Sequence, residues 1–517
     1  MTAGAAHQEI WILDFGSQYT QLIARRVREL GVFSRVVPGT VSPEALDWPK
    51  ISGLIFSGGP ASVTDPGSPR CADRILLADV PKLGICYGLQ LYGLRRGARV
   101  RKSEKREYGH AQIKLTGEAD DPLFAGLPGE SDVWMSHGDS LESWPDGFRV
   151  LAHTTDIPVA AVVDPPARFY GVQFHPEVEH TRYGRQILKN FLYEICRCRG
   201  DWTIGNFIEE STAETLAVVG DAHVVLAISG GVDSSVCAAL VNRAIGERVH
   251  PVFVDNGLLR QNEAEEVIAA LARVGMQVHA VHAPEQFLTA LHGVADPEDK
   301  RKIIGRVFIE VFEREAHRWE NVQFLAQGTL YPDLIESVSV LGPSATIKSH
   351  HNVGGLPERM NLKLVEPLKW LFKDEVRQVG RQLGLPDSLI GRHPFPGPGL
   401  AVRILGEVTP EKLVLLRAAD EIFIQELRSS GWYDRIWQAF AVLLSGRTVG
   451  VMGDERTYER IVCLRAVTSS DGMTADVGEI PLEILKRTAN KIINNTKGIN
   501  RVVYDISSKP PATIEWE

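Results

Sequence analysis

Short apolar runs alternate with longer amphipathic segments through the first part of the chain. Residues 10–15 form an apolar run that predicts a buried strand, and residues 19–30 predict an amphipathic helix that ends at Gly31. Residues 53–56 and 82–85 are two further short apolar runs. Because alternating strands and helices are typical of an α/β layer fold, we expect this part to be built around a sheet.

The alternation returns in the middle of the chain. An apolar strand that begins at Val224 is followed by predicted helices over residues 236–244 and 263–274 and by predicted strands over residues 249–254 and 278–282. This order predicts a doubly wound parallel sheet, in which ligands bind at the carboxyl ends of the strands.

Proline and glycine alternate in residues 393–400, and such a segment cannot continue a helix or a central strand. Beyond this boundary a helix is predicted over residues 410–427, followed by further strands. Residues 500–517 alternate like a strand and end in an aromatic residue and acids, so we expect this tail to be docked rather than frayed.

The length of 517 residues allows two to four domains of ordinary size. The pattern predicts an α/β protein with three domains, the last of them smaller, over residues 1–202, 203–393 and 394–517.

The charge balance argues against a nucleic-acid partner. The chain has 56 Lys and Arg against 65 Asp and Glu, for a net charge of −9, so no global basic field is present to hold a nucleic-acid backbone. Apolar runs of membrane-spanning length and the features of a signal peptide are both missing from the sequence. Six cysteines in so long a chain do not form a disulfide framework. We therefore expect a cytoplasmic protein with no membrane partner.

Cys86 lies between a predicted strand and a predicted helix, in the segment Gly84-Ile85-Cys86-Tyr87-Gly88-Leu89-Gln90. Small residues permit a sharp turn there, the thiol is presented to a cleft, and the helix N-terminus favours the thiolate. A lone cysteine of this kind is more often a buried structural residue. The candidate partners decide between the two interpretations.

Those partners are His175 and Glu177, in the segment Gly171-Val172-Gln173-Phe174-His175-Pro176-Glu177. Residues two apart in an extended segment share a face, so the acid can orient the imidazole. Cys86, His175 and Glu177 then fill the roles of nucleophile, general base and orienting acid, with Gly59 and the Tyr87 backbone as candidates for the oxyanion hole. The two motifs, in this order, resemble those of the class I glutamine amidotransferases. The resemblance implies a mixed-sheet domain that hydrolyses glutamine to glutamate and ammonia.

A second candidate site follows the strand that begins at Val224. Its adjacent glycines, hydroxyls and helix N-terminus suit a phosphate group. Its residues are Ser229, Gly230, Gly231, Val232, Asp233, Ser234 and Ser235. A carboxylate beside a phosphate needs a cation between them, so Asp233 implies Mg²⁺, with Asp333 as a possible second ligand.

Residues 229–235, here called the phosphate turn, resemble the pyrophosphate-binding loop of enzymes that split ATP into AMP and pyrophosphate. By that resemblance the substrate is adenylated. Val254, at the end of the next predicted strand, is a candidate to contact the base or ribose of ATP. His350 and His351 also invite a metal interpretation, but structural histidines are favoured because no carboxylate or cysteine lies at ligand spacing.

The whole chain resembles the glutamine-hydrolysing GMP synthetase family. The resemblance rests on the two amidotransferase motifs, the phosphate turn, Lys-Arg-Lys-Ile-Ile-Gly from Lys300, Pro-Phe-Pro-Gly-Pro-Gly-Leu from Pro394, and the tail from Lys509. It implies that xanthosine monophosphate (XMP) is adenylated by ATP and magnesium, and that ammonia then displaces AMP to give GMP. It further implies that Arg301, Lys509 and Glu515 contact XMP, and that the third domain, also of α/β class, forms a homodimer.

Two rival interpretations stay open at this stage. Another adenylating enzyme, such as a glutamine-dependent NAD synthetase or a transfer-RNA thiolase, shares the phosphate turn but should lack the Cys86 elbow or the C-terminal tail. A non-catalytic sensor of nucleotide or glutamine is the alternative outside the enzymes, and the intact Cys86, His175, Glu177 and Asp233 argue against it.

Overall fold

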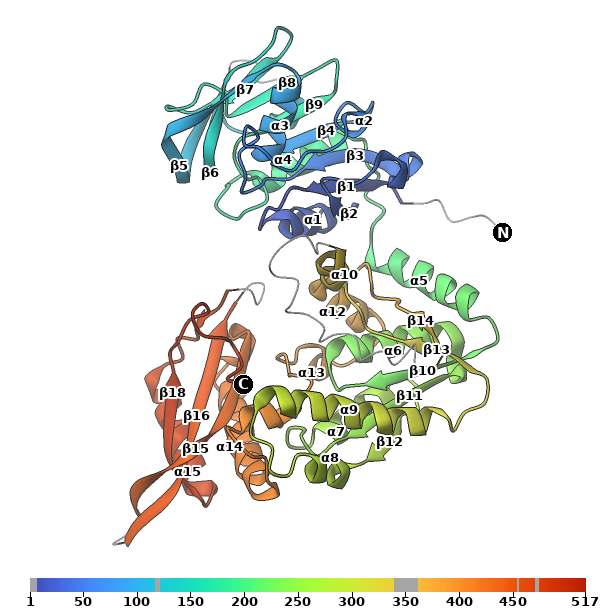
Figure 1. Cartoon of the computed structure of the whole chain (residues 1–517), viewed down its shortest axis with the longest axis vertical. Helices are drawn as coiled ribbons and strands as arrows, with labels where there is room; N and C mark the ends of the chain where they lie inside the picture. Colours follow the sequence, from blue (N-terminus) through green and yellow to red (C-terminus); the bar gives the residue numbers. More distant parts are fainter. Residues whose placement is uncertain (1–6, 117–120, 339–360, 453–454, 470–473) are drawn as a thin grey trace. The chain divides into compact units, whose positions relative to one another are not determined.

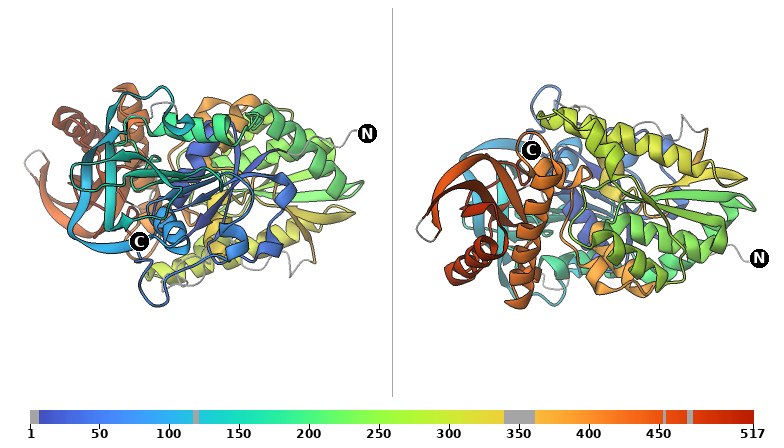
Figure 2. Two further views of the ribbon diagram at one scale, coloured as in Figure 1. Left: turned by 90° about the horizontal axis from the view of Figure 1, so that it is seen from above. Right: turned by 90° about the horizontal axis from the view of Figure 1, so that it is seen from below.

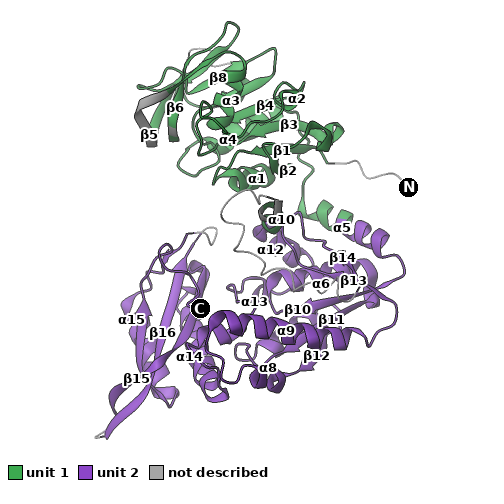
Figure 3. Ribbon diagram, in the orientation of Figure 1, with its two compact units in different colours: residues 1–210, 332–344 green, residues 211–331, 345–517 purple. Residues whose placement is uncertain are grey.

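The computed structural model describes residues 7–116, 121–338, 361–452, 455–469 and 474–517. His350 and His351 lie outside the described residues. The chain divides into two compact units, one of Met1–Glu210 with Pro332–Ser344 and the other of Ser211–Tyr331 with Ala345–Glu517 (Figure 3). The predicted boundary between residues 393 and 394 falls inside the second unit, and the three predicted domain ranges stay a prediction.

A nine-stranded mixed sheet forms the centre of the first unit, in the order β2-β1-β3-β4-β9-β8-β7-β5-β6 (Figure 1). The strands from β2 to β9 in this order pair in parallel, and the remaining pairs are antiparallel. The strands are β1 (Glu9–Asp14), β2 (Phe33–Pro38), β3 (Ile51–Phe56), β4 (Lys82–Ile85), β5 (Arg99–Leu115), β6 (Glu130–Ser143), β7 (Arg149–His153), β8 (Ala161–Asp164) and β9 (Phe169–Val172). The predicted strands over residues 10–15, 53–56 and 82–85 are confirmed.

Helices cover this sheet. They are α1 (Thr20–Glu29), α2 (Asp73–Leu76), α3 (Tyr87–Arg95) and α4 (Gly184–Asn190), the last continued by a wider turn over Phe191–Ile195. Leu13, Leu54 and Phe56, from alternate positions of two strands, share a buried cluster with Leu89 and Tyr92 of α3. Because alternate side chains of a strand point to the same side, α3 packs against that face of the sheet.

The second unit contains a parallel sheet of five strands in the order β12-β11-β10-β13-β14. The strands are β10 (His223–Ile228), β11 (Val249–Asp255), β12 (His279–His282), β13 (Val322–Ala326) and β14 (Lys363–Val365). From β10 the chain adds β11 and then β12 on one side of that strand, and it later adds β13 and β14 on the opposite side of β10. This is the predicted doubly wound order, and its topological switch point lies between β10 and β13.

Helices lie on both faces of this parallel sheet (Figure 2). α6 (Val232–Ile245) and α12 (Lys373–Gln382) pack together over one face, and α9 (Pro297–Ala316) covers the other. Burial on both faces explains why β10 is apolar at successive positions. The other helices of this part of the chain are α5 (Ile204–Val219), α7 (Glu263–Ala272), α8 (Pro284–Ala290), α10 (Tyr331–Val338) and α13 (Asp387–Ile390).

The C-terminal region adds a second sheet to the same unit. Its strands are β15 (Gln438–Met452), β16 (Glu455–Thr468), β17 (Asp476–Val477) and β18 (Ile499–Asp505), and its helices are α14 (Pro410–Ser429) and α15 (Leu482–Asn495). One buried cluster joins Val225 and Leu325 of the parallel sheet to Leu416 of α14 and Leu464 of β16. The two regions therefore share a continuous hydrophobic core.

The tail is docked, as its sequence predicts. Its first part is β18, which pairs in parallel with β16. The guanidinium of Arg465 is fully buried and donates to the carbonyl oxygens of Ser507, Thr513 and Ile514 at 2.7, 3.0 and 3.3 Å, and it pairs with Asp505 at 3.0 Å. A buried cation needs such acceptors, so Arg465 fixes the path of the tail after β18.

His393 is a buried histidine that the fold holds neutral. Its ring stacks on Tyr433, Nε2 donates to the Tyr433 carbonyl at 2.9 Å, and Nδ1 accepts from the Ala439 N–H at 3.1 Å. Burial, aided by the charges of Arg260 and Arg428, lowers the pKa of His393 to about 4, although the bond to Tyr433 opposes this shift. The unfolded chain therefore binds more protons below about pH 6.5, and stability falls as the pH falls toward 4.

We predict that the free energy of unfolding depends less on pH below 6.5 in His393→Gln than in the wild type, because glutamine keeps a donor and an acceptor but cannot be protonated. The wild type should lose about 2 kcal/mol between pH 7 and pH 5 from this group alone. The measurement is the difference in thermal midpoint between variant and wild type at pH 7 and at pH 5. Parallel pH curves for the two proteins would contradict this role of His393.

Candidate active sites

Cys86 lies in a strained turn between β4 and α3. Its φ of 49° and ψ of −103° place it in the left-handed half of the map, where residues other than glycine are uncommon. The turn needs Gly88, because a Cβ there would lie 2.4 Å from the carbonyl oxygen of Phe56. The thiol is buried, with 5% of the residue exposed. The geometry is that of a nucleophile elbow.

His175 and Glu177 follow β9, the strand that pairs with β4. His175 Nδ1 lies 2.7 Å from a carboxylate oxygen of Glu177, and Cys86 lies near enough to the ring to act on its charge. The ring of Tyr19 packs edge-on against the imidazole at 5.1 Å between centroids. The structure thus brings together the three side chains that the sequence predicts as a triad.

The triad favours a charged imidazole. Burial works against the charge on His175, but the Glu177 carboxylate, its hydrogen bond to the ring and the neighbouring Cys86 outweigh it and raise the pKa of His175 to about 10. The proton of the thiol can therefore reside on the imidazole, which leaves the sulfur as a thiolate nucleophile.

Gly59 and Tyr87 stay predictions as oxyanion-hole donors. Gly59 follows β3, and a Cβ there would lie 2.8 Å from the Phe15 carbonyl oxygen. Tyr87 is the first residue of α3, so its N–H is one of the unpaired donors at the positive end of that helix.

The phosphate turn connects β10 to α6, at the switch point of the parallel sheet. Gly230 has a φ of 78°, and Gly231 is the N-cap of α6. The hydroxyls of Ser229 and Ser234 lie 3.0 Å apart, and Ser235 donates to the Gly231 carbonyl at 2.9 Å. The first turn of α6 begins at Val232, so its free N–H groups face this loop.

Asp233 has a partner that the sequence did not reveal. Both carboxylate oxygens of Asp233 accept from the Lys373 ammonium at 2.6 Å, and Lys373 is the first residue of α12. The side chains are 31% and 43% exposed, so the pair can exchange for a ligand. The charge of Asp233 calls for a cation beside it, and in the structure a lysine fills that role.

The two candidate magnesium acids belong to different compact units. Asp233 lies in the second, whereas Asp333 lies in the first turn of α10 in the first. Within the part of the chain that the structure describes, no group of three or more His, Cys, Asp or Glu side chains is arranged to hold a metal. A site formed by Asp233 and the phosphates of a nucleotide fits this donor set, because Mg²⁺ commonly uses one or two carboxylates and substrate oxygens.

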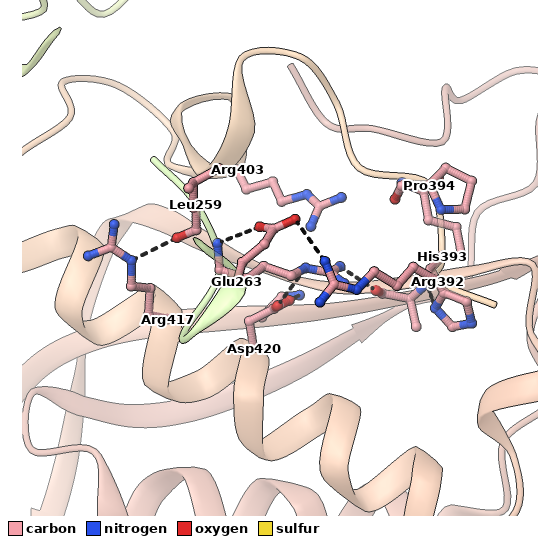
Figure 4. A network of polar contacts seen from close by, with 12 residues as sticks. Leu259, Glu263, Arg392, His393, Pro394, Arg403, Arg417 and Asp420 are labelled. Carbon is pink, nitrogen blue, oxygen red and sulfur yellow. Dashed lines mark hydrogen bonds and ion pairs between the residues drawn. The ribbon is translucent and has the colours of Figure 1, made fainter. Parts of the chain in front are cut away.

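The loop after β11 is held by a buried polar network (Figure 4). Val254 is buried near the end of β11, and Arg417 of α14 donates to the carbonyl oxygens of Gly257 and, at 2.8 Å, Leu259. Arg260 pairs with Asp420 of α14 at 3.1 Å. The C-terminal region therefore fixes the loop beside the predicted ATP site.

Glu263 links this network to the phosphate turn. A Cβ at Gly230 would lie 3.3 Å from a Glu263 carboxylate oxygen, which lies 3.8 Å from the Arg392 guanidinium (Figure 4). Burial raises the pKa of Glu263, against the opposing effects of Arg260, Arg392 and Arg403. The charge of this carboxyl group is therefore balanced by three arginines, one of which, Arg260, also pairs with Asp420 of α14.

Two of the predicted XMP contacts lie near the end of the tail. Glu515 accepts from Arg403 at 2.8 and 3.1 Å and from Gln438 at 2.7 Å. Arg301 of α9 donates to the Glu517 carbonyl, and the neighbouring Lys300, which is fully buried, pairs with the Glu517 carboxylate. The tail is thus tied to both α9 and the C-terminal sheet.

Lys509, the third predicted contact, lies earlier in the tail. It lines an open pocket of about 590 Å³ with Thr468, Ser469, Thr474, Ala475, Asp476, Ser508 and Pro510. Hydroxyls and a lysine at one pocket are chemically suited to a phosphate or a ribose. The roles of Arg301, Lys509 and Glu515 toward XMP stay predictions.

Sequence reasoning missed several polar partners of these sites. They are Lys373 beside Asp233, Arg403 and Gln438 beside Glu515, Gln173 beside Cys86, and Gln90 beside Gln173. Of these residues, Gln90 and Gln173 alone belong to the two sequence motifs that contain Cys86 and His175. The others come from elements far along the chain, and no spacing rule relates them to the residues that they contact.

Comparison with known proteins defines the class of this protein. The family model described as "Glutamine amidotransferase class-I" matches residues 11–195, the model "NAD synthase" matches residues 204–303, and the model "GMP synthase C terminal domain" matches residues 425–516. The chain is therefore a class I glutamine amidotransferase joined to an ATP-dependent synthetase.

Relatives over the full length define the family. The proteins named GMP synthase [glutamine-hydrolyzing] of Aquifex aeolicus (strain VF5) and Nitratidesulfovibrio vulgaris (strain DP4) are each 56% identical to this chain, over 98% and 99% of it and 99% and 100% of their own lengths. The chain belongs to the glutamine-hydrolysing GMP synthase family. Among solved structures, a putative GMP synthase subunit from Thermoplasma acidophilum is 35% identical, covering 37% of this chain and 94% of its own with a TM-score of 0.33.

Proposed function

We propose that this protein makes GMP from XMP, glutamine and ATP. Glutamine and water give glutamate and ammonia in the first unit. In the second unit, XMP and ATP give adenylated XMP and pyrophosphate, and ammonia then displaces AMP to give GMP. The observation that carries the proposal is the match to glutamine-hydrolysing GMP synthases over almost the whole chain, including the Cys86 elbow and the C-terminal tail.

The contacts of Cys86 support a thioester route for the first reaction. His175 accepts the thiol proton, the sulfur attacks the carboxamide carbon of glutamine, and the imidazolium returns the proton to the departing ammonia. Water then hydrolyses the thioester with His175 as base. Glu177 holds the imidazole through Nδ1, which leaves Nε2 toward the sulfur. The N–H groups of Gly59 and Tyr87 are our candidates to hold the oxyanion.

For the second reaction, the turn from Ser229 to Ser235 binds the pyrophosphate of ATP, and Val254 packs against its adenosine. Asp233, together with phosphate oxygens of the nucleotide, would hold Mg²⁺, which would supply charge neutralisation. Lys373 moves from Asp233 to a phosphate oxygen when the nucleotide binds, since its flexible ammonium is a mobile point charge. Arg301, Lys509 and Glu515 contact XMP.

The C-terminal region is our candidate for a homodimer interface. Val449 and Val451 of β15 are 48% and 74% exposed, and Tyr458, which pairs directly with Val449 on β16, is 63% exposed. Three large apolar side chains close together on one strand pair suit contact with a second copy of the chain. We also propose a cytoplasmic location, since ATP and nucleoside monophosphates are cytoplasmic metabolites. None of the described helices is long and apolar enough to cross a bilayer.

We predict that Cys86→Ala abolishes GMP formation with glutamine but leaves it unchanged with ammonium salts. The thiol serves only acyl transfer, and removing a nucleophile of this type typically costs about 10⁴-fold or more. GMP is quantified with each nitrogen source. Cys71→Ala, at a half-buried thiol in the same unit, is the matched control and should keep both activities. Loss of the ammonia-supported activity in folded Cys86→Ala would contradict the division of labour.

We predict that Asp233→Asn impairs GMP formation with either nitrogen source and raises the magnesium concentration needed for half-maximal rate. Both routes require adenylation, and the substitution removes a charged ligand. The measurement is pyrophosphate release against magnesium concentration. Asp333→Asn tests the second candidate acid in the same assay. A wild-type magnesium curve for Asp233→Asn would remove the proposed ligand role.

We predict that the double variant Val449→Asp, Val451→Asp is monomeric, because four charges placed in a symmetric interface repel one another. Light scattering after gel filtration should give the wild type twice the chain mass of 57.1 kDa and the variant the chain mass. Val218→Asp, at another exposed apolar residue, should stay dimeric. A monomeric wild type would exclude the proposed homodimer.

A further inference from the structure

Two buried glutamine side chains form a short hydrogen-bonded series that ends at Cys86. Gln173 is fully buried directly after β9, and its Nε2 lies 3.4 Å from Cys86 Sγ. Gln90 of α3 is 3% exposed, and its Nε2 lies 3.3 Å from Gln173 Oε1 and 2.8 Å from the carbonyl oxygen of Asp139. Neither amide has a part in the Cys86–His175–Glu177 triad.

The strand pairing explains why Gln173 meets Cys86. Ile85 of β4 is in register with Val172 of β9, and the Cys86 N–H donates to the Val172 carbonyl at 2.8 Å. The next residues on the two strands are therefore neighbours at the carboxyl edge of the sheet. Their separation follows from backbone hydrogen bonds and does not depend on a flexible loop.

The surroundings fix which end of each amide faces the sulfur. A backbone carbonyl can only accept, so Gln90 presents its NH₂ group to Asp139. The same NH₂ group faces Gln173, which therefore turns its oxygen toward Gln90. The NH₂ group of Gln173 is left facing Cys86. The reversed arrangement would bring two NH₂ groups or two oxygens together in a buried site, which is costly.

An N–H donor at this point favours the ionised sulfur. The Cys86 thiol also lies 3.7 Å from the carbonyl oxygen of Ser136, an acceptor that favours the protonated thiol. A donor has the opposite effect, because a hydrogen bond to the charged form stabilises that form. Gln173 thus offsets the Ser136 carbonyl, and it does so without transferring a proton.

We propose that Gln173 is a further catalytic residue of the glutaminase site, whose Nε2–H group holds the Cys86 thiolate, and that Gln90 is a positioning residue that keeps this donor turned toward the sulfur. The proposal rests on the proposed glutaminase function of Cys86. The thiol proton passes to His175 as before. As the carbon–sulfur bond forms, charge leaves the sulfur, the Gln173 bond weakens, and the donor remains in place for the thiolate that returns on hydrolysis.

The bond to Gln173 has opposite effects on the amount and on the reactivity of the thiolate. A hydrogen bond to a charged group shifts a titration midpoint by about one to two pH units. Nucleophilicity falls with basicity at a Brønsted slope of about 0.4–0.5, so each unit costs only about threefold in intrinsic reactivity. Removing the donor should therefore slow the thiol reaction below the midpoint and accelerate it on the alkaline plateau.

The test is the pH profile of Cys86 alkylation by iodoacetamide in the full chain, followed at that residue by peptide mass spectrometry. Gln173→Met, of similar shape but without a donor, should move the midpoint upward by about one to two pH units and raise the plateau about threefold or more. Gln173→Glu, of nearly identical shape but with acceptor oxygens only, should shift the midpoint further.

The Gln90 part of the proposal is tested by a double-mutant cycle. Gln90→Met alone should shift the midpoint in the same direction but less, since the Gln173 amide can then turn over. When Gln173 is already replaced by Met, Gln90→Met should cause no further shift of the midpoint, because the orienting amide of Gln90 then has no amide left to orient. Additive shifts would show that Gln90 acts independently and would exclude the positioning role.

Two outcomes would overturn the role of Gln173. One is an alkylation profile of Gln173→Met and Gln173→Glu that equals that of the wild type. The other is a change of the alkylation rate by the same factor at every pH, so that the profiles of variant and wild type do not cross. The thermal unfolding midpoint and the circular dichroism spectrum of the same preparations check that the chain, including the first unit, is folded. The alkylation profile needs neither glutamine nor XMP, so failure of this proposal is distinguishable from failure of the proposed function, which would appear as a wild type that makes no GMP.

Discussion

Parallel strand pairing is the constraint on which both candidate sites depend. Neighbouring parallel strands end at the same edge of a sheet, so residues that follow them meet even when they are far apart in sequence. The pairing of β4 with β9 brings Cys86 to Gln173 and His175, and the pairing of β10 with β11 and β13 places the phosphate turn at the switch point. In each case backbone hydrogen bonds set the separation before any side chain takes part.

Buried charge provides the second level of organisation. Arg403, Arg465 and Lys300 are each fully buried, and each is bound to the C-terminal tail or to the segment beside it. Removing such a cation from water is costly unless its acceptors lie in place, so each one requires a particular path of the tail. The tail, which carries two of the residues predicted to contact XMP, is therefore positioned by Lys300 of α9, Arg403 of the segment before α14 and Arg465 of β16.

The same electrostatic logic relates the phosphate turn to its surroundings. Asp233 is an acid where a polyphosphate is expected, and Lys373 balances it in the structure. Glu263 is a second acid beside Gly230, and Arg260, Arg392 and Arg403 balance its charge. A phosphate bound at this turn would therefore lie beside two acids, each of which is balanced by a cation of the same unit.

Local sequence patterns were enough to predict several strands and the candidate reactive groups. Apolar periodicity located β1, β3, β4, β10 and β11 within one or two residues, and the spacing around Cys86, His175 and the Ser229–Ser235 turn predicted their chemistry, because both depend on residues close together in the chain. Tertiary structure alone decided that Lys373 neutralises Asp233, that Arg403 holds Glu515, and that Gln173 turns its NH₂ group to Cys86. These contacts depend on strand order and register, which arise from packing across the whole sheet and leave no periodic signal in the sequence.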